Sequence, residues 1–282
     1  MDNFLQVKRT VIDLGTEKEY RFFQISDMHM ACLDEESSQT DINDHKRFHK
    51  QWDSLKRDFA KDAGELCDER YDVEPNIIFE KLAKHALDIK ADALILSGDI
   101  FDRVTESNLR YMKKFMGDYP LPVIYCPGNH AWINEAGEHL NQYERFNGII
   151  KNPAIDSFDF GELEIVTVDN GTKQITNEQI RFLKDKLSGD KKIALVVHAP
   201  LNLGEFGERL AEKMSPYFLL GVNGDCENAF LFNRLVKEND DKIICVLAGH
   251  IHAFYEGNVT ENLKQYTTSS GLIGAGREII IK

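Results

Sequence analysis

Long apolar runs are missing from this sequence. No stretch approaches the roughly 20 apolar residues that a membrane-spanning helix requires. The first residues, MDNFLQVKRTVIDLG, also lack the basic start and the apolar segment of a secretory signal. Both absences favour a soluble protein, and a cytoplasmic location is the default expectation.

Paired cysteines are missing as well. The five cysteines are odd in number and widely scattered, and none forms a C-x-x-C pair with another. They are Cys32, Cys67, Cys126, Cys226 and Cys245. This excludes both a disulfide framework and a thiolate zinc site. Cys126 and Cys245 lie within apolar runs, and we expect both to be buried.

A dense basic segment is the third absence. The chain has 34 Lys and Arg residues against 47 Asp and Glu residues, which gives a formal net charge of −13. Proteins that bind a long nucleic acid through its backbone usually present a basic surface, because neutralised phosphates release counterions. The acidic balance therefore argues against a polymer substrate, although a local site can differ from the average.

The sequence does contain short apolar runs that alternate with helical stretches. Runs at 22–25, 93–96, 123–126, 164–168, 193–197 and 243–247 predict strands that are covered on both faces. Two further strands are predicted at 266–270 and 278–281. The alternation of strands and helices is typical of an α/β chain. Because no repeat or linker interrupts it, we expect one domain over residues 1–282.

Helical periodicity fills the segments between these runs. Apolar residues recur at helical spacing from Phe48 to Leu66, at 109–115 and at 229–237, and Pro75 can open a helix that continues to Ile89. Thr176 and Gln179 are placed for a capping box. Two stretches, at about 31–74 and 202–228, resemble insertions. Segments of that length often cover active sites, and the alternative is a peripheral decoration without a chemical role.

Metal-binding side chains follow five of the predicted strands. They are Asp27, His29, Asp99, Asn129, His198, His250 and His252. Because ligands of α/β sheets bind at the carboxyl ends of the strands, we expect these side chains to converge. Imidazole and carboxylate ligands without thiolate suit Mn, Fe or Zn. Seven ligands exceed the needs of one catalytic ion, so the sequence predicts two divalent or trivalent metal ions.

These motifs resemble those of the calcineurin-like metallophosphoesterase superfamily. The matching segments appear in the same order, each after a strand, over about residues 22–270: D-x-H at Asp27, G-D-x-x-D at Gly98, G-N-H at Gly128, the histidine His198 and G-H-x-H at Gly249. The resemblance implies a four-layer α/β/β/α sandwich with a dinuclear metal centre between its sheets. It also implies that a hydroxide bridging the two ions attacks a phosphate mono- or diester.

The resemblance further assigns a role to each residue. Asp27, His29 and His252 would hold the first ion, Asn129, His198 and His250 would hold the second, and Asp99 would bridge the two. His130 matches the histidine that contacts the phosphate and protonates the leaving alkoxide. Asp102 matches the carboxylate that orients this histidine, and such a carboxylate raises the pKa of an imidazole as a general acid requires.

The sequence departs from the family pattern at two positions. Ala131 replaces the acidic residue that commonly follows G-N-H. If Asp102 orients His130, catalysis should survive this change. Arg103 matches an arginine that grips phosphate in the protein phosphatase branch, so it joins Asn129 as a predicted substrate-binding residue. The glycine that follows in that branch is Val104 here, which does not support protein phosphatase activity, and an ordinary surface arginine is the alternative reading of Arg103.

Three other features each have a functional and a purely structural interpretation. His45 and His49 could share a helix face as zinc-binding pairs do, but no third ligand is evident, so a solvated helix is favoured. Trp132 could stack on a substrate ring, and a packing role is favoured. The glycine-rich segment 269–276 could cradle a phosphate, and a turn before the last strand is favoured.

The sequence as a whole predicts a hydrolase of phosphate esters, with a small-molecule or nucleotide-type substrate favoured. The first alternative is a nuclease of the same superfamily, because GDIFD at residues 98–102 is close to the G-D-x-F-D form of double-strand-break repair nucleases. The acidic balance and the short chain argue against it. The second alternative is a binding scaffold that has lost catalysis, and Ala131 is its only support. The sequence indicates no oligomeric state.

Overall fold

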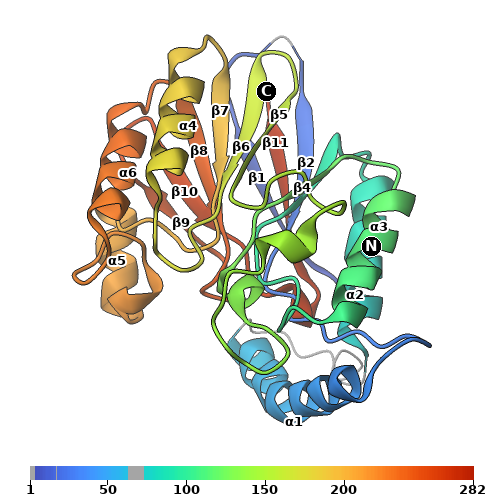
Figure 1. Cartoon of the computed structure of the whole chain (residues 1–282). Coiled ribbons are helices and arrows are strands. Elements are labelled where there is room, and N and C mark those ends of the chain that lie inside the picture. Colours follow the sequence, from blue (N-terminus) through green and yellow to red (C-terminus); the bar gives the residue numbers. More distant parts are fainter. Residues whose placement is uncertain (1–3, 17, 63–72) are drawn as a thin grey trace.

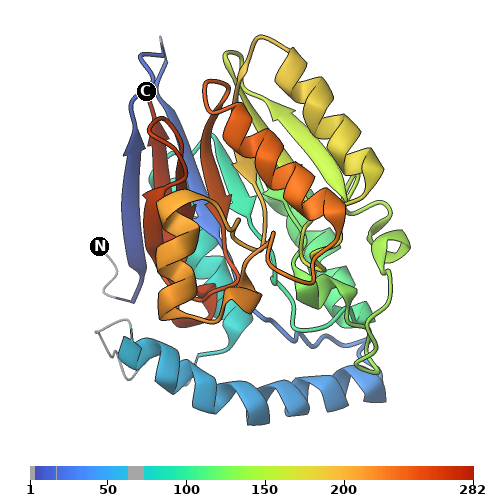
Figure 2. The ribbon, with the colours of Figure 1, turned by 90° about the vertical axis from the view of Figure 1, so that its left-hand side faces the viewer.

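Two β-sheets packed face to face form the centre of the molecule, and helices cover their outer faces (Figure 1, Figure 2). The computed structural model describes residues 4–16, 18–62 and 73–282, and within 52–62 it describes the backbone alone. Phe22 and Val196 belong to the apolar core between the sheets, whereas their neighbours Phe23 and Leu195 belong to cores beneath the helices. Successive strand residues point to opposite faces, so a strand covered on both faces needs a continuous apolar run.

The first sheet has five strands in the order β1-β11-β2-β3-β4. Its strands are β1 (Gln6–Ile12), β2 (Tyr20–Ile25), β3 (Ala93–Leu96), β4 (Val123–Tyr125) and β11 (Ala275–Ile281). Strands β2, β3 and β4 are parallel, so their carboxyl ends lie at the same edge. Strand β11 runs antiparallel to β2 and parallel to β1.

The second sheet has six strands in the order β5-β6-β7-β8-β10-β9. Its strands are β5 (Ile155–Asp159), β6 (Leu163–Val168), β7 (Lys192–Val196), β8 (Ile243–Ala248), β9 (Tyr255–Asn258) and β10 (Lys264–Thr267). The four central strands are parallel, and the edge strands β5 and β9 are antiparallel to their neighbours. The carboxyl ends of β7 and β8 therefore also lie together.

Helices complete a four-layer α/β/β/α arrangement, as the family resemblance implies (Figure 1, Figure 2). The helices are α1 (Gln39–Asp62), α2 (Pro75–Asp88), α3 (Glu106–Asp118), α4 (Asn177–Ser188), α5 (Gly204–Lys213) and α6 (Glu227–Glu238). Apolar residues of α2 and α3 pack on the first sheet, and those of α4 and α6 pack on the second. Pro75 opens α2, and the capping box of Thr176 and Gln179 is present. None of these helices, within the described residues, has the length and apolar character needed to cross a bilayer.

The structure also corrects several element predictions. The helix predicted from Phe48 onward is α1, which begins earlier, at Gln39, and the stretch 202–228 contains α5, a helix that the sequence pattern does not predict. Figure 1 shows α1 lying across one end of the sheets. The strand predicted at 266–270 is β10, which ends at Thr267. The predicted helical positions Ala63 and Leu66 lie outside the described residues, as does Cys67, whereas Cys126 and Cys245 are buried as expected.

Candidate metal centre

The residues predicted as metal ligands all lie just after the carboxyl ends of parallel strands. Asp27 and His29 follow β2, Asp99 follows β3 and Asn129 follows β4 in the first sheet. In the second sheet His198 follows β7, and His250 and His252 follow β8. The two edges face each other, so seven side chains that are separated by more than 200 positions in the sequence form two adjacent clusters.

The first cluster consists of Asp27, His29 and His252. The Nε2 atom of His252 lies 3.2 Å from the Nε2 atom of His29 and 3.2 Å from Oδ1 of Asp27. Asp27 is fully buried, and its Oδ1 atom faces the His252 ring. A buried carboxylate oxygen that faces two ring nitrogens is a set of electron-pair donors, and this set fits a cation better than it fits a hydrogen-bond network.

The second cluster consists of Asp99, Asn129, His198 and His250. The Nε2 atom of His198 lies at its centre. It is 3.1 Å from Oδ2 of Asp99, 3.1 Å from Oδ1 of Asn129 and 3.1 Å from Nδ1 of His250. The backbone N–H of His250 donates to Oδ2 of Asp27 at 2.9 Å, which links this cluster to the first.

The electrostatics of both clusters favour a cation. Burial raises the pKa of the Asp27 carboxyl, but the His252 ring lowers it by a larger amount. The resulting pKa is about 2, below the ordinary value. Burial lowers the pKa of His198, whereas the Asp99 carboxylate raises it, and the result is about 9. Burial and the neighbouring His198 lower the pKa of His250 to about 3. The ionised carboxylates of Asp27 and Asp99 thus keep His198 protonated although it is buried. A bound metal ion would supply this positive charge instead.

The backbone at the donor residues is strained. Seven described residues other than glycine have positive φ, and five of them are donors. The five donors are Asp27 (φ 54°), His29 (46°), Asp99 (50°), His250 (70°) and His252 (50°). The left-handed conformation costs about 1 to 2 kcal/mol at a residue with a β-carbon. Strain concentrated in this way is typical of functional sites, where the surrounding fold imposes the geometry that the chemistry needs.

Glycines let these loops approach one another. A β-carbon on Gly249 would lie 1.8 Å from Oγ of Ser26 and 2.5 Å from Oδ2 of Asp27. A β-carbon on Gly128 would lie 2.1 Å from Oδ1 of Asp99. The glycines beside the donors are therefore required by space, since any side chain would displace a carboxylate of the cluster.

His130 lies at the rim of the centre, next to Asp102. Its Nδ1 atom donates to the backbone carbonyl of Asp102 at 2.8 Å, whereas the Asp102 carboxylate is 3.4 Å away. The carbonyl and the carboxylate of Asp102 thus both face His130, and the orienting role of the carboxylate stays a prediction. Burial lowers the pKa of His130, but the charges of Asp99 and Asp102 raise it, and the result is about 9. The Asp102 carboxylate also accepts a hydrogen bond from Arg47 of α1.

The structure places Arg103 and Trp132 in supporting contacts. Nη1 of Arg103 donates to the backbone carbonyl of Glu135 at 3.0 Å, so its role as a phosphate contact stays a prediction. Nε1 of Trp132 donates to Oδ2 of Asp169 at 3.0 Å, and its ring packs edge-on against Tyr143, as the packing interpretation expects.

The segment 269–276 supports the loop that carries Asp27. Oγ of Ser270 donates to the backbone carbonyl of Asp27 at 2.6 Å, and the Gly271 N–H donates to the carbonyl of Ser26 at 2.7 Å. The segment contains a short 3-10 helix (Gly271–Ile273) before β11. It therefore acts as a structured turn beside the donors.

Sequence reasoning missed three residues around the centre. The backbone carbonyl of Ser97 accepts from Nδ1 of His198 at 2.9 Å, which leaves Nε2 to face the cluster. Arg47 reaches Asp102 from α1. Phe218 packs edge-on against His250. Of the three, only Ser97 could have been identified from the sequence, because it directly precedes the G-D motif. Arg47 and Phe218 belong to the two stretches that resemble insertions.

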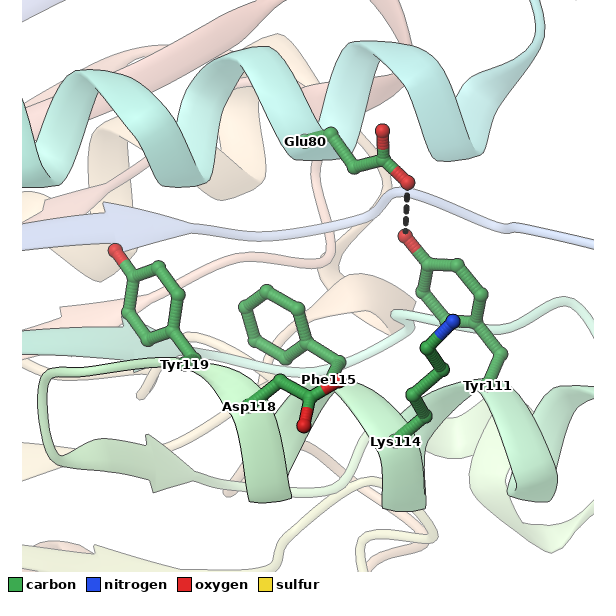
Figure 3. Close-up of a pocket in the computed structure, with 6 residues that line it drawn as sticks. All are labelled: Glu80, Tyr111, Lys114, Phe115, Asp118 and Tyr119. Carbon is green, nitrogen blue, oxygen red and sulfur yellow. Dashed lines mark hydrogen bonds between the residues drawn. The ribbon is translucent and has the colours of Figure 1, made fainter.

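A cavity of about 270 Å³ lies elsewhere, between α2 and α3. Figure 3 shows Tyr111 and Phe115 of α3 and Tyr119 just after it, with Glu80 of α2 accepting a hydrogen bond from Tyr111 at 3.5 Å. None of the residues that line it belongs to either donor cluster.

Comparison with known proteins supports the sequence resemblance. A family model described as calcineurin-like phosphoesterase matches residues 20–254. A protein of Coxiella burnetii described as a probable cyclic nucleotide phosphodiesterase is 26% identical over 171 residues, which cover 58% of this chain and 61% of the relative. The chain thus matches less than two thirds of that relative's length.

Solved structures share the fold at low sequence identity. A dimetal phosphatase from Danio rerio superposes with a TM-score of 0.54 at 10% identity, covering 92% of this chain and 91% of that one. A purple acid phosphatase from yellow lupin seeds has a TM-score of 0.51 at 13% identity, covering 93% of this chain and 45% of that one. Both similarities concern the fold alone.

Proposed function

Because the chain belongs to the calcineurin-like phosphoesterase family, we propose that it hydrolyses phosphate mono- or diesters with two metal ions held at the strand ends. In this proposal Asp27, His29 and His252 would hold one ion, and Asp99, Asn129, His198 and His250 would hold the other. The observation that carries the proposal is the convergence of these seven side chains into two adjacent clusters, in which the Asp27 carboxylate is fully buried. Manganese, iron and zinc all suit this donor set.

The metal ions would supply positive charge, while protein side chains orient the reacting groups and provide the proton for the leaving oxygen. Two divalent ions, when bound, neutralise a phosphate and lower the pKa of bound water from about 15.7 towards about 7. His130 then acts as the general acid for the leaving oxygen. Its Nδ1 atom donates to the Asp102 carbonyl, so we assign the transfer of the proton to Nε2. Ser97 similarly fixes the ring of His198.

A small-molecule or nucleotide-type substrate is the class we propose. The relative described as a cyclic nucleotide phosphodiesterase supports it at the level of similarity. The formal net charge of −13 opposes a long nucleic acid that binds through its backbone. A nuclease activity would appear as cleavage of single- or double-stranded DNA in the presence of Mn²⁺, and we expect none.

A catalytically inactive scaffold is the remaining alternative. It predicts a defective metal site, but all seven donor positions carry ligand-type side chains and lie together. The residue at position 131 is Ala131, a buried residue whose β-carbon cannot act as an acid or a base. The orienting carbonyl of Asp102 is a backbone group, which a side-chain change at 131 does not remove.

The test is hydrolysis of an aryl phosphate and of an aryl phosphodiester under metal-defined conditions. Asp99→Asn and His250→Ala should each lower turnover by at least about 100-fold, because each removes a donor to the ion pair. Circular dichroism should show a retained fold. His139→Ala, a change at an exposed histidine outside both clusters, serves as the matched control and should keep wild-type turnover. Near-wild-type turnover in either test variant would show that the assignment is wrong.

A further inference from the structure

A third group of possible metal ligands lies away from the proposed centre. It consists of His45 and His49 of α1 and Glu74, the residue before α2. One ligand atom from each of the three lies within 4.8 Å of the other two. The Nε2 atom of His49 is 3.2 Å from Oε2 of Glu74. The centres of the His45 and His49 rings are 4.4 Å apart. The group shares no residue with the clusters at the strand ends.

The two histidines occupy adjacent turns on one side of α1. Residues four apart lie one above the other on a helix, which is the spacing of zinc-binding pairs. Phe48 fixes this side of the helix, because its fully buried ring packs with Ala31 and Leu272. Glu74 comes from a distant part of the chain, and for this reason the sequence alone indicated no third ligand.

His45 is oriented as a metal ligand requires. Its Nδ1 atom lies 2.6 Å from the backbone carbonyl of Ala31. A carbonyl only accepts hydrogen bonds, so Nδ1 carries the proton and Nε2 presents its electron pair. Histidines that bind metal ions commonly donate their second ring nitrogen to a backbone carbonyl in this way.

We propose that His45, His49 and Glu74 bind a divalent ion of the zinc type. Two imidazoles and one carboxylate are a known zinc donor set, and water can complete the tetrahedron. The side chains of His49 and Glu74 are 28% and 46% exposed, so an ion can reach the site from solvent. The carboxylate offsets part of the charge of the ion. A bound ion would join α1 to the residue that precedes α2. The proposal does not depend on the phosphoesterase activity.

The experiment compares metal content between matched variants. Wild type and the double variant His45→Ala/His49→Ala are stripped, loaded with Zn²⁺ alone and dialysed, and zinc per chain is measured by mass spectrometry. We expect the double variant to hold one ion fewer than the wild type, whatever number the strand-end centre takes. His139→Ala, at an exposed histidine, should hold the same number as the wild type. An equal zinc content in the wild type and the double variant overturns the proposal.

A second variant separates a metal site from an ordinary imidazole–carboxylate hydrogen bond. Glu74→Gln keeps an acceptor for His49 but removes the charge, so the helix contact survives. The affinity of the third zinc site should fall at least about 10-fold in competition with a chromophoric chelator, since a charged ligand is lost. Unchanged zinc affinity in Glu74→Gln would show that these three residues only hydrogen-bond to each other. Because both readouts are metal binding, failure of the phosphoesterase assay leaves their interpretation unaffected.

Discussion

At the residue scale, the proposed proton transfer depends on His130. His130→Ala should slow the hydrolysis of alkyl phosphodiesters, with poor leaving groups, by about 10²- to 10⁴-fold. Nitrophenyl esters should be slowed much less, because nitrophenolate leaves without a proton. Turnover numbers for the two substrates give the ratio that tests the role. Equal slowing of both esters would remove His130 as the acid, and His139→Ala should leave the ratio unchanged.

The convergence of the proposed metal ligands could be predicted because their identity and their position in the sequence both carry information. Asp27 and His250 are ligand-type residues that follow strands, and the edges of parallel strands converge by topology. The contact between His130 and the Asp102 carbonyl could not be predicted, since every residue has a carbonyl and the sequence does not say which one faces the ring. Glu74 was equally hidden, because an exposed glutamate next to a helix start has no distinctive pattern.

At the element scale, α1 contacts the candidate centre through Arg47, which donates a hydrogen bond to the Asp102 carboxylate. The Asp102 carboxylate is almost fully buried and accepts from Arg47, which is 29% exposed. Arg47→Ala would remove one donor from this carboxylate, which also lies beside His29 and His130, and a charged hydrogen bond contributes about 1.5 to 3 kcal/mol. We expect the free energy of unfolding to fall by about this amount, as measured by urea denaturation.

Arg110 offers a matched control for this prediction. It forms a pair with Asp34 whose two side chains are 33% and 37% exposed. Exposed pairs contribute about 0 to 1 kcal/mol, so Arg110→Ala should shift the urea midpoint much less than Arg47→Ala. Equal shifts would mean that the contact between Arg47 and Asp102 contributes no more than a surface pair, and that α1 is held by other contacts.

The central strands of both sheets could be predicted, whereas three edge strands could not. Strands β3, β7 and β8 are buried on both faces, and only a continuous apolar run satisfies that environment. Strands β1, β5 and β9 lie at sheet edges, and the sequence YEGN of β9 contains a charge and a glycine. Edge strands are specified by their pairing partner more than by their own residues.

At the scale of the whole molecule, each donor cluster takes residues from both sheets. In the first, Asp27 and His29 follow β2 of one sheet and His252 follows β8 of the other. An ion that binds the folded protein alone stabilises it, by about 2.7 kcal/mol at a concentration 100 times its dissociation constant. Bound ions should therefore strengthen the contact between the sheets.

Removal of metal should consequently lower the stability of the entire fold. We expect the thermal midpoint of unfolding to be lower in chelator than with excess Mn²⁺, in one cooperative transition. The Asp27→Asn variant should show a smaller difference between the two conditions, since one ligand to the ions is weakened. Equal midpoints of the wild-type protein with and without Mn²⁺ would contradict this prediction.

The left-handed backbone at five donor positions limits how this site can be altered. Asparagine and glycine tolerate positive φ, whereas longer or branched side chains adopt it at a cost. Asp27→Asn is therefore a clean removal of charge, but Asp27→Glu changes the local conformation together with the reach of the carboxylate. If the proposed centre binds metal ions, exchanging its ligands must first satisfy this loop geometry, so the backbone as well as the donor atoms would set which metals it accepts.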